Sequence, residues 1–360
     1  MLVHPLKGAF GGAERYLELL ASGLSRQNFD VSLFCFGNRS EDDNNVFARL
    51  RSAGRRAFST ASARNPLPLW KALRSTGSEI VHWNFLDPFA FEGGAFLLFP
   101  WSRPQVITDH LPMMRARAHR ELTRRLANRR TGAVIVVGNA GEQAAQAHWG
   151  RQPTVVVRNG IEVPTQVARE PPKPDEPIRL LFIGRLESQK DPLFAVDVLR
   201  ATLAIGRNAR LRIVGDGSLR RAIADATGGA QNREAIEIAG FAVDPVAEMA
   251  NAHFLLAPSR FEGMPFTPIE ALASGLPVVA SDIPPHRELR EHTSAIALLP
   301  PKDPASWART VVELSRDLTQ LSSAAMKIAE AFSVNRMVTE TIAVYEAVFR
   351  RDRRQVGLRL

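Results

Sequence analysis

Cysteine is nearly absent from this 360-residue sequence, whose single cysteine, Cys35, lies in the apolar run 31–36. One cysteine excludes a disulfide framework within the chain, and we expect a buried, unreactive thiol. Long apolar runs are missing as well, because no stretch reaches the roughly 20 residues that a membrane-spanning helix needs. No signal-peptide pattern is visible at the N-terminus. We therefore expect a cytoplasmic protein that is soluble or bound at the inner face of the cytoplasmic membrane.

Two familiar ligand-binding motifs are also missing. The glycine loop GAFGGAERY at 8–16 departs from the G-x-G-x-x-G fingerprint, so a nicotinamide cofactor is not indicated. We find no convincing D-x-D motif of the kind that binds a metal–diphosphate complex. The sequence therefore predicts a protein with no cofactor and no metal ion.

Basic residues are in excess, giving a net charge of +9, and they are unevenly spread. Seven arginines lie between Arg115 and Arg130 against one acid, Glu121, and the C-terminus adds RRDRR at 350–354. Such clusters favour anionic partners, namely phosphates, an acidic membrane surface or nucleic acid. The simpler alternative is a solvated basic helix face with no dedicated partner.

Apolar, β-branched runs alternate with helical patterns for most of the length, which is typical of βαβ units and parallel sheets. We expect helices over 13–24, about 192–205 and about 338–350. The sequence therefore predicts an α/β fold with two successive domains. The runs interpreted as strands are 31–36, 79–83, 105–110, 133–138, 154–160, 178–184, 209–217, 237–241, 253–259 and 276–282.

The two domains are separated by a change in composition. Residues 163–177, VPTQVAREPPKPDEP, are rich in proline and charge and have no periodicity, so we interpret them as a linker. This gives an N-terminal domain over 1–162, a C-terminal domain over 178–335, and a last helix over 336–360 that is expected to pack back toward the N-terminal domain. Open parallel sheets bind ligands beyond the carboxyl ends of their strands, so a cleft between the domains is the expected ligand site.

Glycine loops follow predicted strands in both domains. Gly11 and Gly12 open the first helix, and Gly215 ends the strand at 209–217. Glycine allows the backbone to pass close to a ligand, and the amides of a helix N-terminus attract phosphate or carboxylate. Alone, such loops are a weak signal, because glycine turns before helices are common.

A pair of cations lies at the end of the first strand of the C-terminal domain. The turn FIGRLESQKDP at 182–192 presents Arg185 and Lys190 together. Two cations there would neutralise a diphosphate leaving group without a metal ion. The alternative is two surface cations beside Glu187 and Asp191.

The most specific pattern is PSRFEGMPFTPIEALASGLPVVASD at 258–282, in which Glu262 and Glu270 lie eight residues apart across a loop that enters a helix. An acid pair beside a loop that offers amides suits recognition of sugar or ribose hydroxyls, because carboxylates accept hydrogen bonds. The alternative is a capping box, with Thr267 as N-cap, Pro268 at N1 and Glu270 at N3.

Together these motifs resemble the retaining glycosyltransferase family 4, the group 1 glycosyltransferases, which have the two-domain GT-B fold. The resemblance is carried by GGAER at 11–15, VVRNGIE at 156–162, GRLESQK at 184–190, GDG at 215–217 and the E-x7-E block at 262–270. It implies two Rossmann-like domains whose parallel sheets face each other across a cleft. The N-terminal domain would bind the acceptor and the C-terminal domain the nucleotide-sugar donor.

The resemblance also implies roles for residues of the C-terminal domain. Arg185 and Lys190 would grip the donor diphosphate as part of the catalytic machinery. Glu262 would contact the transferred sugar and Glu270 the nucleotide ribose. The loop that approaches sugar and phosphate would consist of Gly263, Met264, Pro265 and Phe266, with Pro265 unable to donate because it has no N–H.

In the N-terminal domain, the resemblance implies that Gly11 and Gly12 close on the donor. His110 falls where many relatives place an active-site histidine near the transferred sugar, and His82 is the rival candidate. The acidic neighbour Asp109 would orient or charge His110. A histidine at a strand end is about as often structural.

The sequence thus indicates a retaining, metal-independent glycosyltransferase of polysaccharide biosynthesis that uses a UDP- or GDP-sugar. The acceptor would be a glycan or a lipid-linked sugar, and Arg115–Arg130 would contact an anionic membrane. Nucleic acid is not the expected partner. The alternatives are a catalytically silent scaffold subunit that binds nucleotide sugars, and a GT-B sugar-nucleotide epimerase.

Overall fold

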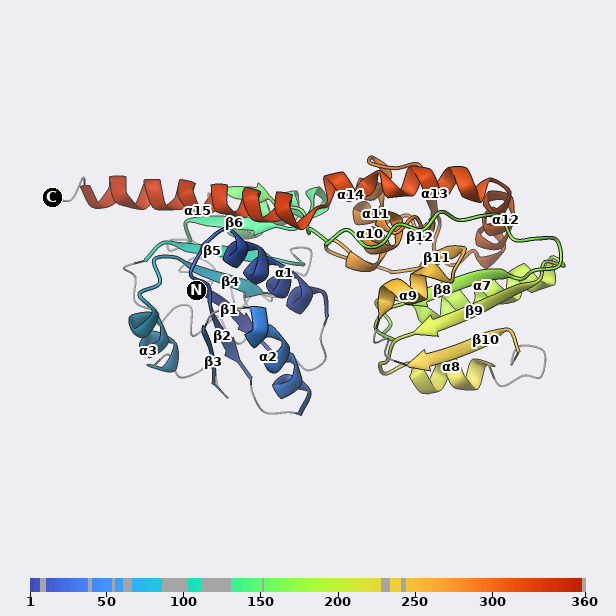
Figure 1. Ribbon diagram of the computed structural model, residues 1–360, viewed down its shortest axis with the longest axis horizontal. Helices are drawn as coiled ribbons and strands as arrows, with labels where there is room; N and C mark the ends of the chain where they lie inside the picture. The colour runs from blue at the N-terminus through green and yellow to red at the C-terminus, as the bar shows by residue number, and fades with distance from the viewer. Residues whose placement is uncertain are drawn as a thin grey trace. The chain divides into compact units, whose positions relative to one another are not determined.

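The protein folds as two compact units in the computed structural model, one formed by residues 1–160 and 333–360, the other by residues 161–332. The structure describes residues 1–6, 11–37, 41–53, 56–60, 67–85, 103–111, 131–150, 152–227, 234–240 and 244–357. Each unit is a parallel sheet covered by helices on both faces (Figure 1). The predicted α/β class with two Rossmann-like domains is confirmed.

Unit 1 is built on a parallel sheet whose order is β3-β2-β1-β4-β5-β6-β7. Its central strands are buried on both faces, as expected for strands covered by helices. The strands are β1 Leu2–Pro5, β2 Ser32–Phe36, β3 Arg56–Thr60, β4 Val81–Phe85, β5 Gln105–Asp109, β6 Ala133–Val136 and β7 Thr154–Val156. The helices are α1 Gly12–Arg26, α2 Glu41–Ala53, α3 Leu67–Thr76, η2 Asn139–Gly141, α6 Glu142–Trp149 and α15 Val334–Gly357.

The two faces of this sheet differ in chemistry. One face packs on α3 and α6 through an apolar cluster that includes Val3, Trp83 and Trp149. Residues alternate between faces along a strand, so the opposite face carries the polar side chains of His82 and Thr108. This second face therefore combines apolar helix packing with a buried polar network.

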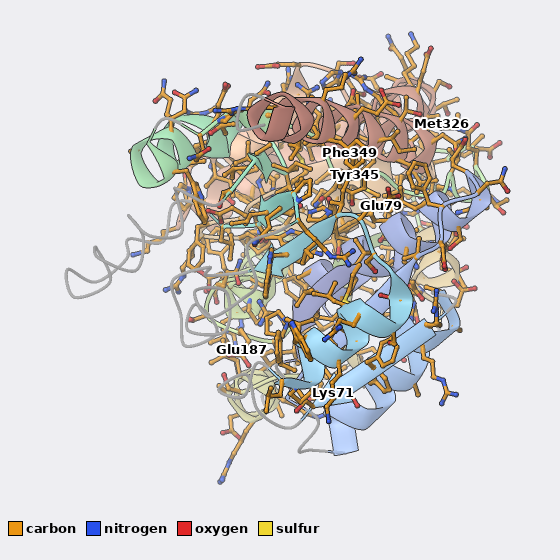
Figure 2. All side chains as sticks on the ribbon, turned by 90° about the vertical axis from the view of Figure 1, so that its left-hand side faces the viewer. Lys71, Glu79, Glu187, Met326, Tyr345 and Phe349 are labelled. Carbon is orange, nitrogen blue, oxygen red and sulfur yellow. The ribbon has the colours of Figure 1, made fainter. Side chains whose placement is uncertain are left out.

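The last helix, α15, belongs to unit 1 and lies beside α1 (Figure 1). A side chain at Gly23 of α1 would collide with Val338 of α15, so the two helices approach closely there. Tyr345, labelled on α15 in Figure 2, hydrogen-bonds through its hydroxyl to Nδ1 of His82 at 2.6 Å. The C-terminal helix is thus fixed to the central strand β4 by a buried hydrogen bond.

Unit 2 is built on a parallel sheet whose order is β10-β9-β8-β11-β12-β13. Its strands are β8 Ile178–Ile183, β9 Ala209–Val214, β10 Ile236–Gly240, β11 Phe254–Ala257, β12 Val278–Ser281 and β13 Ile296–Leu299. The helices and 3-10 segments are α7 Pro192–Ala204, α8 Arg220–Thr227, α9 Pro245–Ala250, α10 Phe266–Ala273, α11 Pro284–Arg290, α12 Pro304–Leu314, η3 Ser315–Asp317, α13 Leu318–Met326 and α14 Ile328–Ala331.

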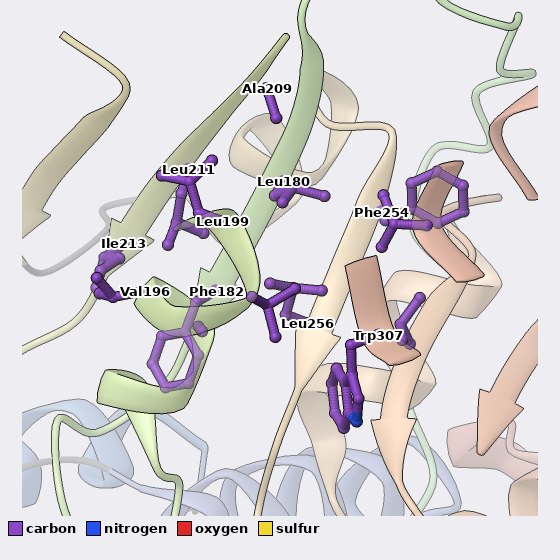
Figure 3. Packing of buried hydrophobic residues seen from close by; sticks show 14 of the residues in the cluster. Leu180, Phe182, Val196, Leu199, Ala209, Leu211, Ile213, Phe254, Leu256 and Trp307 are labelled. Atoms are coloured by element: carbon purple, nitrogen blue, oxygen red, sulfur yellow. The ribbon is translucent and has the colours of Figure 1, made fainter. Parts of the chain in front are cut away.

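The main core of unit 2 lies between the sheet and the helices α7 and α12. Figure 3 shows Leu180 and Phe182 of β8 against Val196 and Leu199 of α7, with Trp307 of α12 nearby. These side chains are almost completely buried. Burying each one contributes about 1.5–3 kcal/mol relative to leaving it exposed, so this core holds the carboxyl ends of β8, β9 and β11 in place.

The segment 163–177, interpreted above as a linker, lies within unit 2. The amide of Val167 donates to the carbonyl of Ser274 at 3.0 Å, and the amide of Arg169 donates to Oγ of Ser322 at 3.2 Å. The chain crosses between the units at 160/161 and again at 332/333 rather than within this segment. Composition alone did not indicate these backbone anchors.

Candidate functional site

The loops that follow β9 and β8 approach each other very closely. Gly215 follows β9 with a φ of +145°, a conformation that residues with a side chain rarely adopt. A Cβ atom placed there would lie 1.9 Å from the carbonyl oxygen of Gly184, directly before Arg185. The glycine predicted from the sequence is therefore required by the contact between two strand-end loops.

Glu187 ties the same two loops together by side-chain hydrogen bonds. Its carboxylate accepts from the amide of Ser218 at 2.9 Å and from the hydroxyl of Ser218 at 2.7 Å. These bonds stabilise the charged form and lower the pKa of Glu187. Glu187 is therefore engaged with the loop after β9, which argues against the interpretation of Arg185 and Lys190 as cations simply paired with neighbouring acids.

The loop after β8 is also attached to the loop after β11. The amide of Arg260 donates to the carbonyl of Gln189 at 2.8 Å, and Nε of Arg260 donates to Asp191 at 2.9 Å. Asp191 adopts a left-handed conformation with a φ of +50° at the start of α7. Because β9, β8 and β11 are neighbours in the sheet, their three loops form one connected edge.

Arg185, Gln189, Lys190 and Glu262 meet at this edge. Arg185 is exposed and donates from Nη2 to Oε1 of Gln189 at 2.9 Å. Gln189 donates in turn to the carbonyl of Phe261 at 3.0 Å and to Oε2 of Glu262 at 3.4 Å. Nζ of Lys190 lies 2.5 Å from Oε1 of Glu262, an ion pair without the direction of a good hydrogen bond. Three predicted residues are thus brought together, with Gln189, which the sequence analysis did not single out, between them.

The helix after this loop begins earlier than the capping-box alternative requires. Its N-cap is Pro265, and α10 starts at Phe266, so Glu270 lies at the fifth helical position instead of N3. The capping-box interpretation is therefore wrong. Met264, Pro265 and Phe266 are buried, whereas Gly263 and Glu270 are partly exposed. Of these five predicted residues, Gly263 and Met264 lie in the loop, Pro265 is the N-cap, and Phe266 and Glu270 lie in α10.

A buried histidine that the sequence analysis missed lies at the end of the next strand. His286 follows β12 in α11 and is fully buried, and its Nδ1 lies 2.8 Å from the carbonyl oxygen of Ser281. Burial lowers the pKa of His286, whereas the carbonyl contact with Ser281 and the charge of Glu262 oppose this effect. A lone histidine in a proline-rich turn gave no signal in the sequence.

In unit 1, Glu14 holds the glycine turn at the start of α1. Its Oε2 accepts from the amide of Gly11 at 2.9 Å, and its Oε1 lies 3.1 Å from Nε2 of His4 on β1. Gly11 is the N-cap of α1, and Gly12 is its first residue. The buried carboxylate therefore connects the predicted glycines to the central strand.

The two candidate histidines of unit 1 have different surroundings. Both ring nitrogens of His82 are bonded, Nδ1 to Tyr345 at 2.6 Å and Nε2 to Thr108 at 2.7 Å. His110 is buried, and its Nε2 has no hydrogen-bond partner within the part of the chain that the structure describes. Burial lowers the pKa of both histidines to about 3. His82 is thus used structurally, whereas Nε2 of His110 is without a partner among the described residues.

Asp109 does not act on His110 as the sequence analysis expected. Its carboxylate accepts from Nε1 of Trp149 at 3.1 Å and from the amide of Leu111 at 3.3 Å. Among the described residues, the charges that affect the pKa of His110 belong to His4 and Glu14. Consecutive residues of a strand point to opposite faces of the sheet, which explains the separation of Asp109 from His110.

A second buried residue that the sequence analysis missed is Asn84 near the end of β4. It is in register with Thr108, and neither atom of its amide has a hydrogen-bond partner among the described residues.

The arginine-rich segment Arg115–Arg130 and most of the aromatic segment 84–101 lie outside the described residues. Within the described ranges, no helix is long and apolar enough to cross a membrane.

Two family models match this sequence. The model described as Glycosyltransferase Family 4 matches residues 10–163, and the model described as Glycosyl transferases group 1 matches residues 177–317. The chain belongs to the family 4, group 1 glycosyltransferases. The resemblance inferred from the motifs is therefore confirmed, and it extends over both units.

Curated relatives of this chain include bacterial glycosyltransferases. A glycosyltransferase assigned to colanic acid biosynthesis in Salmonella typhimurium is 30% identical over 206 residues, 52% of this chain and 50% of that protein. A GDP-mannose:cellobiosyl-diphosphopolyprenol alpha-mannosyltransferase of Xanthomonas oryzae is 26% identical over 265 residues, 69% of this chain and 67% of that protein. This chain thus spans only about half the length of the Salmonella relative.

Solved structures share the fold of this chain. HepE of Anabaena in complex with UDP has a TM-score of 0.76 at 19% identity, covering 96% of this chain and 99% of that chain. The same protein was also solved with UDP-glucose, with a TM-score of 0.74 at 20% identity over 95% of this chain. At this identity the likeness establishes the GT-B fold.

Proposed function

We propose that this protein is a retaining glycosyltransferase that transfers a sugar from a nucleoside-diphosphate sugar to a glycan or a lipid-linked sugar. The observation that carries the proposal is the meeting of Arg185, Lys190 and Glu262 at the edge formed by β8 and β11. Two cations beside a carboxylate suit a ligand that combines a diphosphate with sugar hydroxyls. The Anabaena neighbour, solved with UDP-glucose, binds a ligand of this class.

In the proposed mechanism, Arg185 and Lys190 stabilise the negative charge that develops on the departing nucleoside diphosphate. Preorganised charge of this kind contributes several kcal/mol for each well-placed donor. The loop Gly263–Phe266 and the carboxylate of Glu262 orient the transferred sugar, and Glu270 binds the ribose. The two cations take the place of a metal ion in this proposal.

The acceptor is proposed from chemistry shared with relatives. The Xanthomonas oryzae relative is named for transfer to a saccharide on a polyprenyl diphosphate. We extend this acceptor class to the present chain. The roles of Gly11, Gly12 and His110 in unit 1 remain predictions. Nε2 of His110 is buried and has no partner in the part of the chain that the structure describes, which supports contact with a hydroxyl.

The first test measures donor binding by thermal shift with UDP-, GDP- and ADP-sugars in the presence of EDTA. A rise in melting temperature with one base, lost in Arg185→Ala/Lys190→Ala, supports the donor site. Arg200→Ala, which removes a cation of α7 that pairs with Asp197, is the control and is expected to leave binding unchanged. No shift with any nucleotide sugar, or an equal shift in the double variant, contradicts the diphosphate assignment.

The second test measures the reaction. Radiolabelled donor is incubated with polyprenyl-diphosphate-linked saccharides, and the anomeric configuration of the product is read by NMR. Transfer with the configuration of the donor supports the proposal. Donor binding without turnover would favour the scaffold alternative, and an epimerised nucleotide sugar would favour the epimerase.

A further inference from the structure

Lys190 and Glu262 neutralise each other in the structure. Their charged atoms lie 2.5 Å apart, with side chains 18% and 8% exposed. The inference developed here rests on the proposed function, in which the donor diphosphate binds Lys190. When the diphosphate draws Lys190 away, the nearly buried carboxylate of Glu262 loses a positive partner, which is costly away from water.

His286 has a nitrogen that can compensate this loss. A carbonyl oxygen only accepts hydrogen bonds, so the contact of 2.8 Å with Ser281 places the proton of the neutral ring on Nδ1. Nε2 then carries a lone pair. It is buried and has no hydrogen-bond partner among the described residues. A buried basic atom without a partner is unusual and suggests a use for it.

The charges that surround His286 come from three places. Glu262 in the loop after β11 and Asp282 after β12 raise its pKa, whereas Lys190 in the loop after β8 lowers it. Asp282 is itself paired with Arg287 of α11 at 2.6 Å, so donor binding leaves its charge balanced. Lys190 and Glu262 are therefore the groups whose influence changes when a diphosphate binds.

We propose that His286 takes up one proton from solvent at Nε2 when the donor diphosphate draws Lys190 away from Glu262. The imidazolium then supplies the positive charge that Glu262 has lost. Loss of the nearby ammonium and arrival of two phosphate charges both favour this protonation. His286 is thus a positioning residue, which keeps the Glu262 carboxylate in place while Lys190 serves the leaving group.

The test measures protons exchanged on donor binding. UDP-glucose, or GDP-mannose if that base is preferred, is titrated calorimetrically at pH 7 in buffers of different ionisation enthalpy. The diphosphate of a nucleotide sugar has no ionisation near neutral pH, unlike a terminal phosphate with a pKa of about 6. We expect net proton uptake on binding, of at most one proton per donor, and a Kd that rises with pH by no more than tenfold per pH unit between pH 6 and 8.

The variant His286→Gln is expected to bind the donor with no proton uptake and with a Kd that no longer depends on pH. His253→Gln is the matched control, because His253 is a buried histidine at the opposite end of β11 and should leave the proton uptake unchanged. Uptake that persists in His286→Gln overturns the assignment to this residue.

The wild-type protein alone also decides the question if His286→Gln fails to fold. Donor binding with no proton uptake and a Kd that is constant from pH 6 to 8 overturns the proposal but leaves the proposed donor site standing. Absence of binding by every nucleotide sugar overturns the proposed function, and the inference falls with it.

Discussion

Replacing Gly215 by alanine tests whether the approach of the loops after β8 and β9 holds the candidate site together. The added Cβ would lie 1.9 Å from the carbonyl oxygen of Gly184, where real contacts are essentially never under 3.0 Å. The loops must therefore separate by roughly 1 Å, judged from the close packing of protein interiors. Arg185 follows Gly184 directly, so the displacement reaches the cation that is proposed to bind the diphosphate.

The expected cost has two sources. A residue with a side chain at a φ of +145° adds about 1–3 kcal/mol of backbone strain. Displacing tightly packed backbone adds a further ~1–3 kcal/mol. Gly215→Ala is thus expected to destabilise unit 2 by about 2–6 kcal/mol.

Gly206→Ala is the matched control. Gly206 also has a positive φ, +77°, but a Cβ there meets nothing within 4 Å. Only the strain of a left-handed residue remains, about 1–2 kcal/mol. Urea unfolding followed by intrinsic fluorescence gives both values, taken from the transition of unit 2 if the two units unfold separately. Equal losses in the two variants would refute the reasoning about the close approach.

Two further predictions concern unit 1. Tyr345→Phe removes the hydroxyl that lies 2.6 Å from Nδ1 of His82 and should cost about 1–3 kcal/mol in urea unfolding, because it leaves a buried polar atom unpaired. Burial lowers the pKa of His82 and His110 to about 3, from 6.5 in the unfolded chain. Their stabilisation is therefore complete above pH 6.5 and is lost as the pH falls toward 3. Each histidine should lower the free energy of unfolding by about 2 kcal/mol between pH 6.5 and 5. Urea unfolding at both pH values should therefore show a smaller decrease in His110→Gln than in the wild type.

Much of the fold could be predicted because the strands are continuous apolar runs. The runs at 105–110 and 178–184 became β5 and β8 almost without change. The edge strands β3 and β13 were missed, because the segment RAFST at 56–60 is largely polar and the segment IALL at 296–299 is very short. A continuous apolar run of five or more residues marks a buried strand, and neither of these two segments contains one.

The candidate site could be predicted only in part. Arg185, Lys190 and Glu262 follow strand ends, and neighbouring parallel strands bring their carboxyl ends together, so sequence position was informative. The contact of Gln189 with Phe261 joins loops 72 residues apart, and the contact of His286 with Ser281 depends on the side-chain geometry of one turn. No local pattern records such contacts.

The ion pair of Lys190 and Glu262 predicts that UDP-glucose binds more tightly, relative to UDP, than the charges of the two ligands alone would predict. UDP has more negative charge than UDP-glucose and should bind two cations more tightly. However, UDP draws Lys190 from Glu262 and leaves the carboxylate only Gln189 and the imidazolium proposed for His286, whereas a nucleotide sugar also brings hydroxyls that donate to it. A hydrogen bond that is not made to a buried acceptor costs about 1–3 kcal/mol. The affinity of UDP-glucose relative to that of UDP should therefore be about five- to 150-fold higher than charge alone predicts.

Calorimetric titration of UDP and UDP-glucose into wild type and Glu262→Ala measures this effect directly. The ratio of the two affinities should shift toward UDP by at least fivefold in Glu262→Ala, because the acceptor that rewards sugar hydroxyls is gone. A ratio that is the same in both proteins would mean that Glu262 does not distinguish a sugar from a bare diphosphate. In that case the carboxylate would serve only to neutralise Lys190, and the sugar would be recognised by other groups.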